Sequence, residues 1–351
     1  MRTPSLKLLR VCAIGLFWTA LACGTRQAEP ESRRSARPAP KANARGAPAP
    51  TEPHVGLEPQ LRRAFERQPG FDPLPPPGPG DWRARFDEPE QSVAQFERGP
   101  RVVPTSERKT IFVLPIGSFA GRSPPLALLA EYVRRFVGLP VEVLPAVPAA
   151  AFTVRKRMRS NFVEQLLSGD LLDALRARVP PNGYGLVGVT MSDLFPAPSW
   201  NYVFGEARFD QRVRVYSFAR YDPAFHGEPR GTDSDHRMLE RSLKVMTHEI
   251  GHMFGIAHCA AYRCLMNGSN SLPETDAAPL HLCPICLRKL QLAVGFSPEH
   301  RYRALQAFYV EHGYEREAVW AGDRVTYIEG RSSPPPRGED RTRLNPAAKA
   351  P

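Results

Sequence analysis

Apolar positions in the middle of the chain follow two different repeats, and together they predict an α/β fold. Residues 110–117 (TIFVLPIG) and 183–191 (GYGLVGVTM) are almost unbroken apolar runs, as in strands that are buried on both faces. Residues 126–138 instead repeat apolar side chains every three or four positions, which is typical of a helix with one buried side. A short second strand is expected at residues 141–145.

Further elements are expected before and after the second apolar run. Strands are expected at residues 199–209 and 212–221, and helices at residues 159–179, 287–296 and 298–313. In the two strands we expect Arg208, Arg212 and Arg214 to lie on a solvated face.

One long helix carries the residues with the clearest chemistry. Its apolar stripe consists of residues three and four positions apart: Leu239, Leu243, Met246, Ile250 and Phe254. His248 and His252 lie on the opposite side, one helical turn apart, where both can bind one tetrahedral zinc ion. Glu249 lies a third of a turn round, so it misses the metal and can act as general base on a metal-bound water.

The residues after this helix supply a third histidine. Gly255 can end the helix, because glycine adopts a positive φ without steric cost, and the reversed chain then brings His258 to the metal. Three imidazoles leave a fourth position for water, which is the open coordination of a catalytic zinc. The pentapeptide HExxH alone is a weak signal. Its extension to HExxHxxGxxH, with Met266 downstream, predicts zinc-promoted attack of water on an amide carbonyl.

Four cysteines follow at spacings that suit a second, structural zinc ion. Cys259 and Cys264 are separated by four residues, and Cys283 and Cys286 by two. Two disulfides or free thiols are the alternatives. Zinc is favoured because a Cys-x-x-Cys segment containing Pro284 suits a metal knuckle. We therefore expect two Zn²⁺ ions per chain, one catalytic and one structural.

The order of these motifs resembles a known family. HEIGHMFGIAH, CAAYRCLM and CPICLRKL, in that order, resemble the archaemetzincins, zinc metalloproteases of the metzincin clan. GVTMSDLFPAPSWNYVFGEA and YSFARYD resemble the central strands of that family, and AVGFSPEHRYRAL resembles its final helix. The resemblance covers roughly residues 57–312 and is closer to the longer animal members than to the minimal archaeal form.

The resemblance implies a fold and a set of roles. The fold is α/β and metzincin-like: a mixed, twisted sheet with an antiparallel edge strand, a long active-site helix beneath it, and a zinc-clamped C-terminal part. His248, His252 and His258 would bind the catalytic zinc, Glu249 would be the general acid/base, and Met266 would lie in the turn beneath the metal. The four cysteines would bind the second zinc. Peptides or proteins would be the substrates.

Two further positions follow from the same resemblance. Residues 201–208 correspond to the edge strand that binds the substrate backbone by strand addition. Some metzincins place a tyrosine shortly after the methionine, but Asn267 and Gly268 stand here. The group that stabilises the oxyanion is therefore unassigned, and zinc itself can suffice.

The N-terminal segment has the layout of a signal peptide. Three basic residues precede the apolar run from Val11 to Ala22, which is too short for an ordinary membrane-spanning helix. Because Cys23 follows in a sequence that resembles a lipoprotein processing site, we expect a lipid anchor in a bacterial cell envelope, facing the periplasm. Plain secretion and an uncleaved anchor are the alternatives. Cysteines that form no disulfide are unusual in an oxidising compartment.

Composition divides the rest of the chain. We expect a signal peptide at residues 1–23, a disordered Pro/Ala/Arg-rich tether at 24–56, a leader packed on the catalytic domain at 57–109, the metzincin catalytic domain with the second zinc site at 110–315, and a mostly disordered tail at 316–351. One further hypothesis is that the leader imposes latency, with Asp81 approaching the zinc.

The distribution of charge along the chain and the complete set of motif residues argue against other classes of function. The formal charge of +11 lies mainly at the ends of the chain, whereas nucleic-acid binding requires basic residues clustered on a folded face. We therefore expect no nucleic-acid partner. A catalytically silent peptide-binding pseudo-protease would keep the histidines and dispense with Glu249, and a zinc-stabilised interaction module would need only the cysteines. The complete set favours an enzyme.

Overall fold

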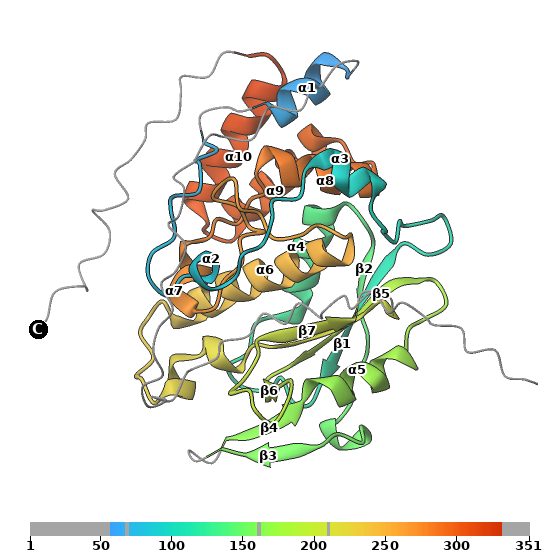
Figure 1. Cartoon of the computed structure of the whole chain (residues 1–351), viewed down its shortest axis with the longest axis vertical. Coiled ribbons are helices and arrows are strands. Elements are labelled where there is room, and N and C mark those ends of the chain that lie inside the picture. The colour runs from blue at the N-terminus through green and yellow to red at the C-terminus, as the bar shows by residue number, and fades with distance from the viewer. Residues whose placement is uncertain (1–56, 67–69, 160–162, 209–210, 332–351) are drawn as a thin grey trace, which may run out of the picture.

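The computed structural model describes residues 57–66, 70–159, 163–208 and 211–331, which form an α/β fold around a five-stranded sheet (Figure 1). The strands lie in the order β2-β1-β5-β8-β7. Their bounds are β1 (Thr110–Ile116), β2 (Val141–Val143), β5 (Gly183–Thr190), β7 (Gly205–Arg208) and β8 (Val213–Ser217). β2, β1, β5 and β8 are parallel, and β7 pairs antiparallel to β8 at the edge.

Helices pack against both faces of this sheet, because successive side chains of each strand point to opposite faces. The helices are α4 (Leu126–Val137), α5 (Ser168–Arg176) and α6 (Ser234–Met253). Ile111 and Val113 of β1 belong to the apolar cluster of α4 and α6, whereas Phe112 and Leu114 belong to the cluster of α5. A strand with both faces covered has to be apolar throughout, which explains the unbroken run at residues 110–117.

A second sheet has three strands. It consists of β3 (Lys156–Met158), β4 (Glu164–Leu167) and β6 (Asp193–Phe195), with β4 between the other two. The helix expected at residues 159–179 is therefore wrong in its first half. The reason is tertiary: β4 pairs with β6, and the buried Gln165 side chain donates to the Asp193 carboxylate at 2.7 Å.

Helices make up the C-terminal part. They are α7 (Leu272–Ala277), α8 (Pro284–Val294), α9 (Pro298–Glu311) and α10 (Glu315–Ile328). The prediction of a mostly disordered tail from residue 316 is wrong up to residue 328. These residues form α10, which packs against α9. Its buried side chains recur every three to four positions: Ala318, Ala321, Val325 and Ile328. Residues 332–351 lie outside the described part.

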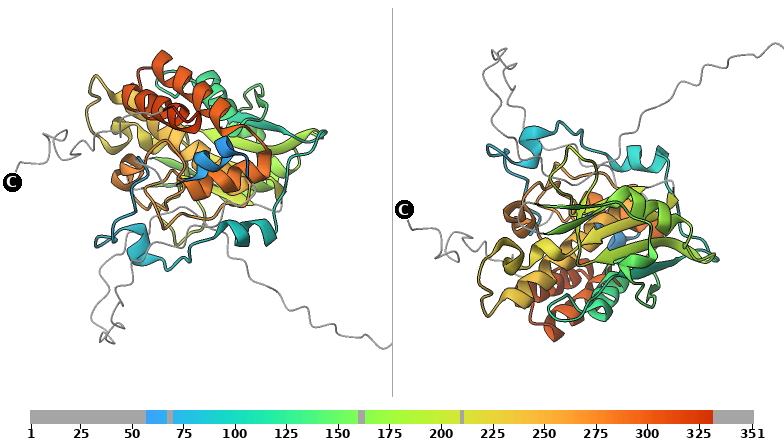
Figure 2. Two further views of the ribbon diagram at one scale, coloured as in Figure 1. Left: turned by 90° about the horizontal axis from the view of Figure 1, so that it is seen from above. Right: turned by 90° about the horizontal axis from the view of Figure 1, so that it is seen from below.

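The leader contributes three short helices: α1 (Pro59–Phe65), α2 (Trp82–Arg85) and α3 (Val93–Arg98). Seen from above in Figure 2, α1 lies over the C-terminal helices, where Arg63 Nε donates to the carbonyl of Ile328 at 2.7 Å. The chain then crosses the loop that follows α6, and α3 contacts α8. Three 3₁₀ helices complete the described elements: η1 (Ala149–Ala151), η3 (Ala219–Tyr221) and η4 (Pro223–His226).

None of the helices in the described part combines the length and the apolar character that crossing a membrane requires. The expected signal peptide at residues 1–23 and the tether at 24–56 lie outside the described residues.

Candidate active site and metal centres

The three predicted histidines converge at the end of α6. His248 and His252 lie on its last two turns, and their Nε2 atoms are 3.0 Å apart. The helix ends at Met253, and Gly255 reverses the chain with a φ of +84°, which favours glycine. His258 returns to the other two, and the ligand atoms of all three rings lie within 4.8 Å of one another.

Each ring is oriented through its Nδ1 atom. His248 Nδ1 lies 2.8 Å from the carbonyl of Leu265, and His252 Nδ1 lies 2.6 Å from the carbonyl of Ile256. Because a carbonyl only accepts hydrogen bonds, these Nδ1 atoms carry the protons. The Nε2 atoms of the two rings therefore present lone pairs to each other.

This arrangement fits a bound cation. Burial lowers the pKa of His248 to about 3 and that of His252 well below its ordinary value, so both rings are neutral. Two lone pairs 3.0 Å apart repel each other unless a positive charge lies between them. His258 Nε2 is also buried without a hydrogen-bond partner in the described part. Zn–N bonds of about 2.1 Å would place such nitrogens about 3.4 Å apart.

Glu249 is buried beside this cluster and forms an ion pair with Arg214 of β8. Glu249 Oε2 lies 3.4 Å from a guanidinium nitrogen of Arg214, and the two side chains are 7% and 2% exposed. Burial raises the pKa of Glu249, while the charges of Arg214 and His258 act in the opposite direction. The carboxylate is thus held between the sheet and the histidine cluster.

The expectation that Arg214 lies on a solvated face is wrong. β8 is an inner strand of the sheet, and Val213 and Val215 face α5. Because side chains alternate, Arg214 faces the opposite side, which α6 covers. The sequence did not give the position of β8 in the sheet, and with helices on both sides this strand has no solvated face. Arg208 instead pairs with Asp173 on α5, and Arg212 donates to the carbonyl of Gly183 at 2.8 Å.

Met266 lies directly against the active-site helix. A Cβ atom added to Gly251 would lie only 2.5 Å from Met266 Sδ. Gly251 stands between the two helix histidines in the sequence, so its missing side chain lets the methionine approach the helix backbone there.

The four cysteines form a second cluster next to the histidines. All are buried and reduced, and their sulfur atoms lie within 4.8 Å of one another. Cys259 Sγ and Cys283 Sγ are 3.7 Å apart, far more than the roughly 2.05 Å of a disulfide. Zn–S bonds of about 2.3 Å place the sulfurs of a tetrahedral site about 3.8 Å apart, so the spacing fits zinc.

Backbone N–H groups point at these sulfurs. Cys264 Sγ accepts from the N–H of Cys283 at 3.2 Å and of Met266 at 3.4 Å, and Cys283 Sγ accepts from the N–H of Cys286 at 3.5 Å. Burial raises the pKa of the Cys283 thiol well above its ordinary value, so four thiolates at this point would need a compensating cation.

The leader contacts the third histidine, His258. The sequence did not indicate this contact. Glu88 Oε2 lies 2.7 Å from His258 Nδ1 and accepts a second hydrogen bond from Trp82 Nε1 at 2.9 Å. Partial burial opposes ionisation of Glu88, but the hydrogen bond and charge of His258 prevail and lower its pKa. Asp81, the residue of the latency hypothesis, instead accepts from the N–H of Gly78 at 2.6 Å.

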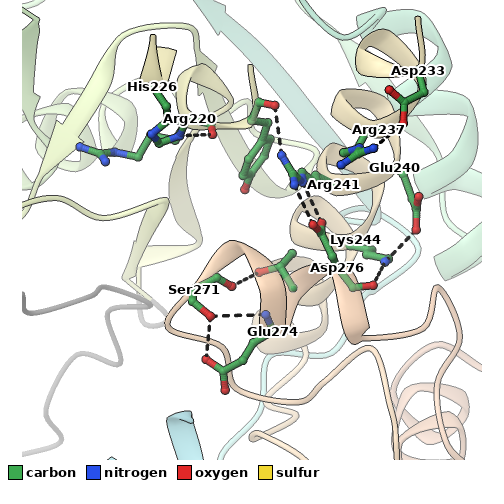
Figure 3. Close-up of polar contacts among 12 residues, drawn as sticks. Arg220, His226, Asp233, Arg237, Glu240, Arg241, Lys244, Ser271, Glu274 and Asp276 are labelled. Carbon is green, nitrogen blue, oxygen red and sulfur yellow. Dashed lines mark hydrogen bonds and ion pairs between the residues drawn. The ribbon is translucent and has the colours of Figure 1, made fainter. Parts of the chain in front are cut away.

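Trp82 is itself fixed by α7. Its backbone N–H donates to Glu274 Oε1 at 2.8 Å, and its ring contacts His258 edge-on, with centroids 5.1 Å apart. Figure 3 shows how α7 is attached to α6: Arg241 donates twice to the Asp276 carboxylate, both at 2.7 Å, and Lys244 donates to the Asp276 carbonyl at 2.9 Å.

The predicted substrate strand corresponds to β7 and the residues before it. β7 spans only Gly205–Arg208 and forms the edge of the larger sheet next to β8. Val203 bridges to Leu194 of β6. In the described part, the side of β7 away from β8 has no strand partner.

The chain is similar to a known family and to known proteins. The sequence model of Peptidase family M54 matches residues 137–292. Archaemetzincin-2 of Macaca fascicularis is 38% identical over 267 residues, covering 67% of this chain and 73% of that protein. Archaemetzincin-2 of Homo sapiens is 37% identical with the same coverage. Human archaemetzincin-1 is 34% identical over 198 residues, covering 48% of this chain and 39% of that protein.

The chain is also similar to solved structures. Archaemetzincin from Archaeoglobus fulgidus, complexed with malonate, is 29% identical with a TM-score of 0.39, and the match covers 51% of this chain and 99% of that one. Archaemetzincin from Methanopyrus kandleri is 31% identical with a TM-score of 0.41, and the match covers 54% and 98%.

Proposed function

Because this zinc metalloprotease belongs to the archaemetzincins, peptidase family M54, we propose that it hydrolyses peptide bonds at the cluster of His248, His252 and His258, with Glu249 as general acid and base. The observation that supports this most strongly is the convergence of three Nε2 atoms beside a buried carboxylate. Peptides or proteins are the substrates of such an enzyme.

The three histidines would hold the catalytic metal. Zinc bound there supplies a Lewis acid that polarises the peptide carbonyl and lowers the pKa of water. The protein fixes all three rings through their Nδ1 atoms, so no imidazole has to rotate to bind the ion. Neutral nitrogen ligands suit zinc, and His₃ sets of this kind leave a coordination position for water.

Glu249 moves the proton in this proposal. Its carboxylate takes a proton from the attacking water and gives it to the amine nitrogen as the peptide bond breaks. Burial raises the pKa of the Glu249 carboxyl group, and the charge of Arg214 acts against this shift and favours the ionised form.

The substrate backbone would add to the free side of β7. Strand addition uses the N–H and C=O groups of an exposed sheet edge, and β7 offers such an edge within the described residues. In this proposal the fold is metzincin-like, and β7 is the antiparallel edge strand that lines the substrate cleft.

The four cysteines would bind the second, structural zinc. Four sulfurs with tetrahedral spacing leave no open position for water or substrate. We assign this ion a role in shaping the loop between His258 and α8.

The test is turnover and metal content of the wild type beside Glu249→Ala. Glu240→Ala, on the same helix but remote from the histidines in sequence, controls for loss of a carboxylate. We expect two zinc ions in all three proteins and a roughly 10³-fold loss of turnover of a peptide library in Glu249→Ala alone. Equal turnover in Glu249→Ala would contradict the assignment. A zinc-loaded wild type that binds peptides without cleaving them would indicate the pseudo-protease alternative.

The location of the chain is a separate proposal. Cys23 would carry lipid after removal of residues 1–22, which would anchor the enzyme in a bacterial envelope, facing the periplasm. Metabolic labelling with an alkyne fatty acid should mark the wild type and leave Cys23→Ser unmarked. Cys12→Ser is the matched control, because Cys12 would be lost with the signal peptide. Label on both variants would refute the proposal.

A further inference from the structure

Glu88 is the only side chain of the leader with a described hydrogen bond to a histidine of the candidate zinc site. The other two rings donate their Nδ1 protons to backbone carbonyls of the loop after α6. His258 instead faces a carboxylate that lies 170 residues earlier in the chain. The third ring thus differs from the first two both in the charge and in the origin of its partner.

The environment of Glu88 is built to hold it at this point. One oxygen atom, Oε2, receives both His258 Nδ1 and Trp82 Nε1, at 2.7 and 2.9 Å. Trp82 is 3% exposed, and the absence of a side chain at Gly268 lets it approach: a Cβ atom there would lie 2.4 Å from the indole ring. Glu274 fixes the backbone of Trp82 from the other side.

We infer that Glu88 is a positioning residue for the zinc site, and that residues 82–91 complete this site rather than cover it as a removable leader. This inference rests on the proposed binding of zinc by His258. A carboxylate that accepts from Nδ1 fixes the tautomer in which Nε2 carries the lone pair, orients the ring, and makes that nitrogen a stronger ligand.

Two neighbouring residues separate this role from simple attachment of the leader. Gln91 exchanges hydrogen bonds with the loop on which His258 lies, from its Nε2 to the carbonyl of Gly255 and from the N–H of Ala257 to its Oε1, both at 3.1 Å. Gln91→Ala therefore weakens the attachment without touching His258. Asp87 is exposed, so Asp87→Asn removes the same charge one residue away.

The experiment measures zinc affinity of the histidine site in the full chain, by competition with a chelating dye, for wild type and these variants. Glu88→Gln keeps an oxygen that can accept both hydrogen bonds and loses only the charge. We expect it to weaken binding of one zinc about 10-fold, and Glu88→Ala about 100-fold. Gln91→Ala and Asp87→Asn should stay within about 3-fold of the wild type. Binding of the other zinc and the thermal transition of Glu88→Gln should not change.

Three results are decisive. Affinity of Glu88→Gln and Glu88→Ala within about 3-fold of the wild type would overturn the inference. So would equal losses in Gln91→Ala and Glu88→Gln, because attachment alone would then explain the effect. A wild type that binds only the cysteine zinc would refute the proposed function itself, and with it the premise of this inference.

Discussion

The histidine cluster ends and the cysteine cluster begins at adjacent residues, His258 and Cys259, yet the two clusters are held in place in different ways. The histidines take their orientation from two parts of the chain: the carbonyls of Ile256 and Leu265 in the loop after α6, and the carboxylate of Glu88 in the leader. The cysteines receive N–H groups mainly from their own segments, as Cys283 does from Cys286. The N–H groups that point at the sulfurs thus come from the cysteine segments themselves, whereas one of the histidines is oriented by the leader.

This difference implies a dependence in one direction. Leu265, which orients His248, and Met266, which contacts Gly251, directly follow Cys264. The N–H of Cys259 also donates to the carbonyl of Met266 at 2.7 Å. A structural zinc would therefore hold the loop that shapes the histidine site, while loss of a histidine would leave the cysteine loop intact.

The largest effect is expected from removing one ligand of each cluster. Cys264→Ala should lose both zinc ions and melt at least about 10 °C lower, because a structural zinc site supplies folding free energy directly. His252→Ala should lose one zinc ion and its turnover, and keep a thermal transition close to that of the wild type. Metal content and calorimetry check both. A His252→Ala protein that also loses the second zinc would refute dependence in one direction.

The next effect concerns the buried ion pair. Arg214→Met leaves the Glu249 carboxylate without its cationic neighbour, so we expect the free energy of unfolding to fall by about 3 kcal/mol and turnover to fall with it. The double variant Arg214→Met/Glu249→Gln should recover most of the stability and none of the turnover. Urea unfolding provides the measurement, with Arg134→Met, at an exposed position of α4, as the surface control. Additive stability losses in the double variant would show that the two side chains are not coupled.

A smaller effect is expected at the contact between helix and loop. In Gly251→Ala the new methyl group meets Met266 Sδ, so we expect a loss of about 1–3 kcal/mol of stability. Adding Met266→Ala should relieve this clash, and the zinc in the cysteine cluster should remain. If the double variant is no more stable than Gly251→Ala, contact with Met266 is not what restricts the size of the side chain at position 251.

Local geometry explains why the convergence of the three histidines was predictable from sequence. A spacing of four residues on a helix places His248 and His252 on one side, and Gly255 marks the turn that follows. The apolar runs likewise predicted β1, β5 and α4. These features depend only on residues close together in the chain.

Features that depend on distant contacts were missed. Nothing near Glu88 in the sequence indicates His258, and Arg214 acquires its partner only when β8 packs over α6. Charged residues obscure the buried repeat of α10, and β4 depends on its pairing with β6. In each case the decisive neighbour comes from another part of the chain.

The central claim is that three imidazoles hold one metal ion beside Glu249. Diffraction from crystals of the zinc-loaded protein, recorded on both sides of the zinc absorption edge, tests it most directly. The account predicts two anomalous peaks, one among His248, His252 and His258 and one among the four cysteines. A single peak at the cysteines, with the histidine rings still facing one another, would contradict it.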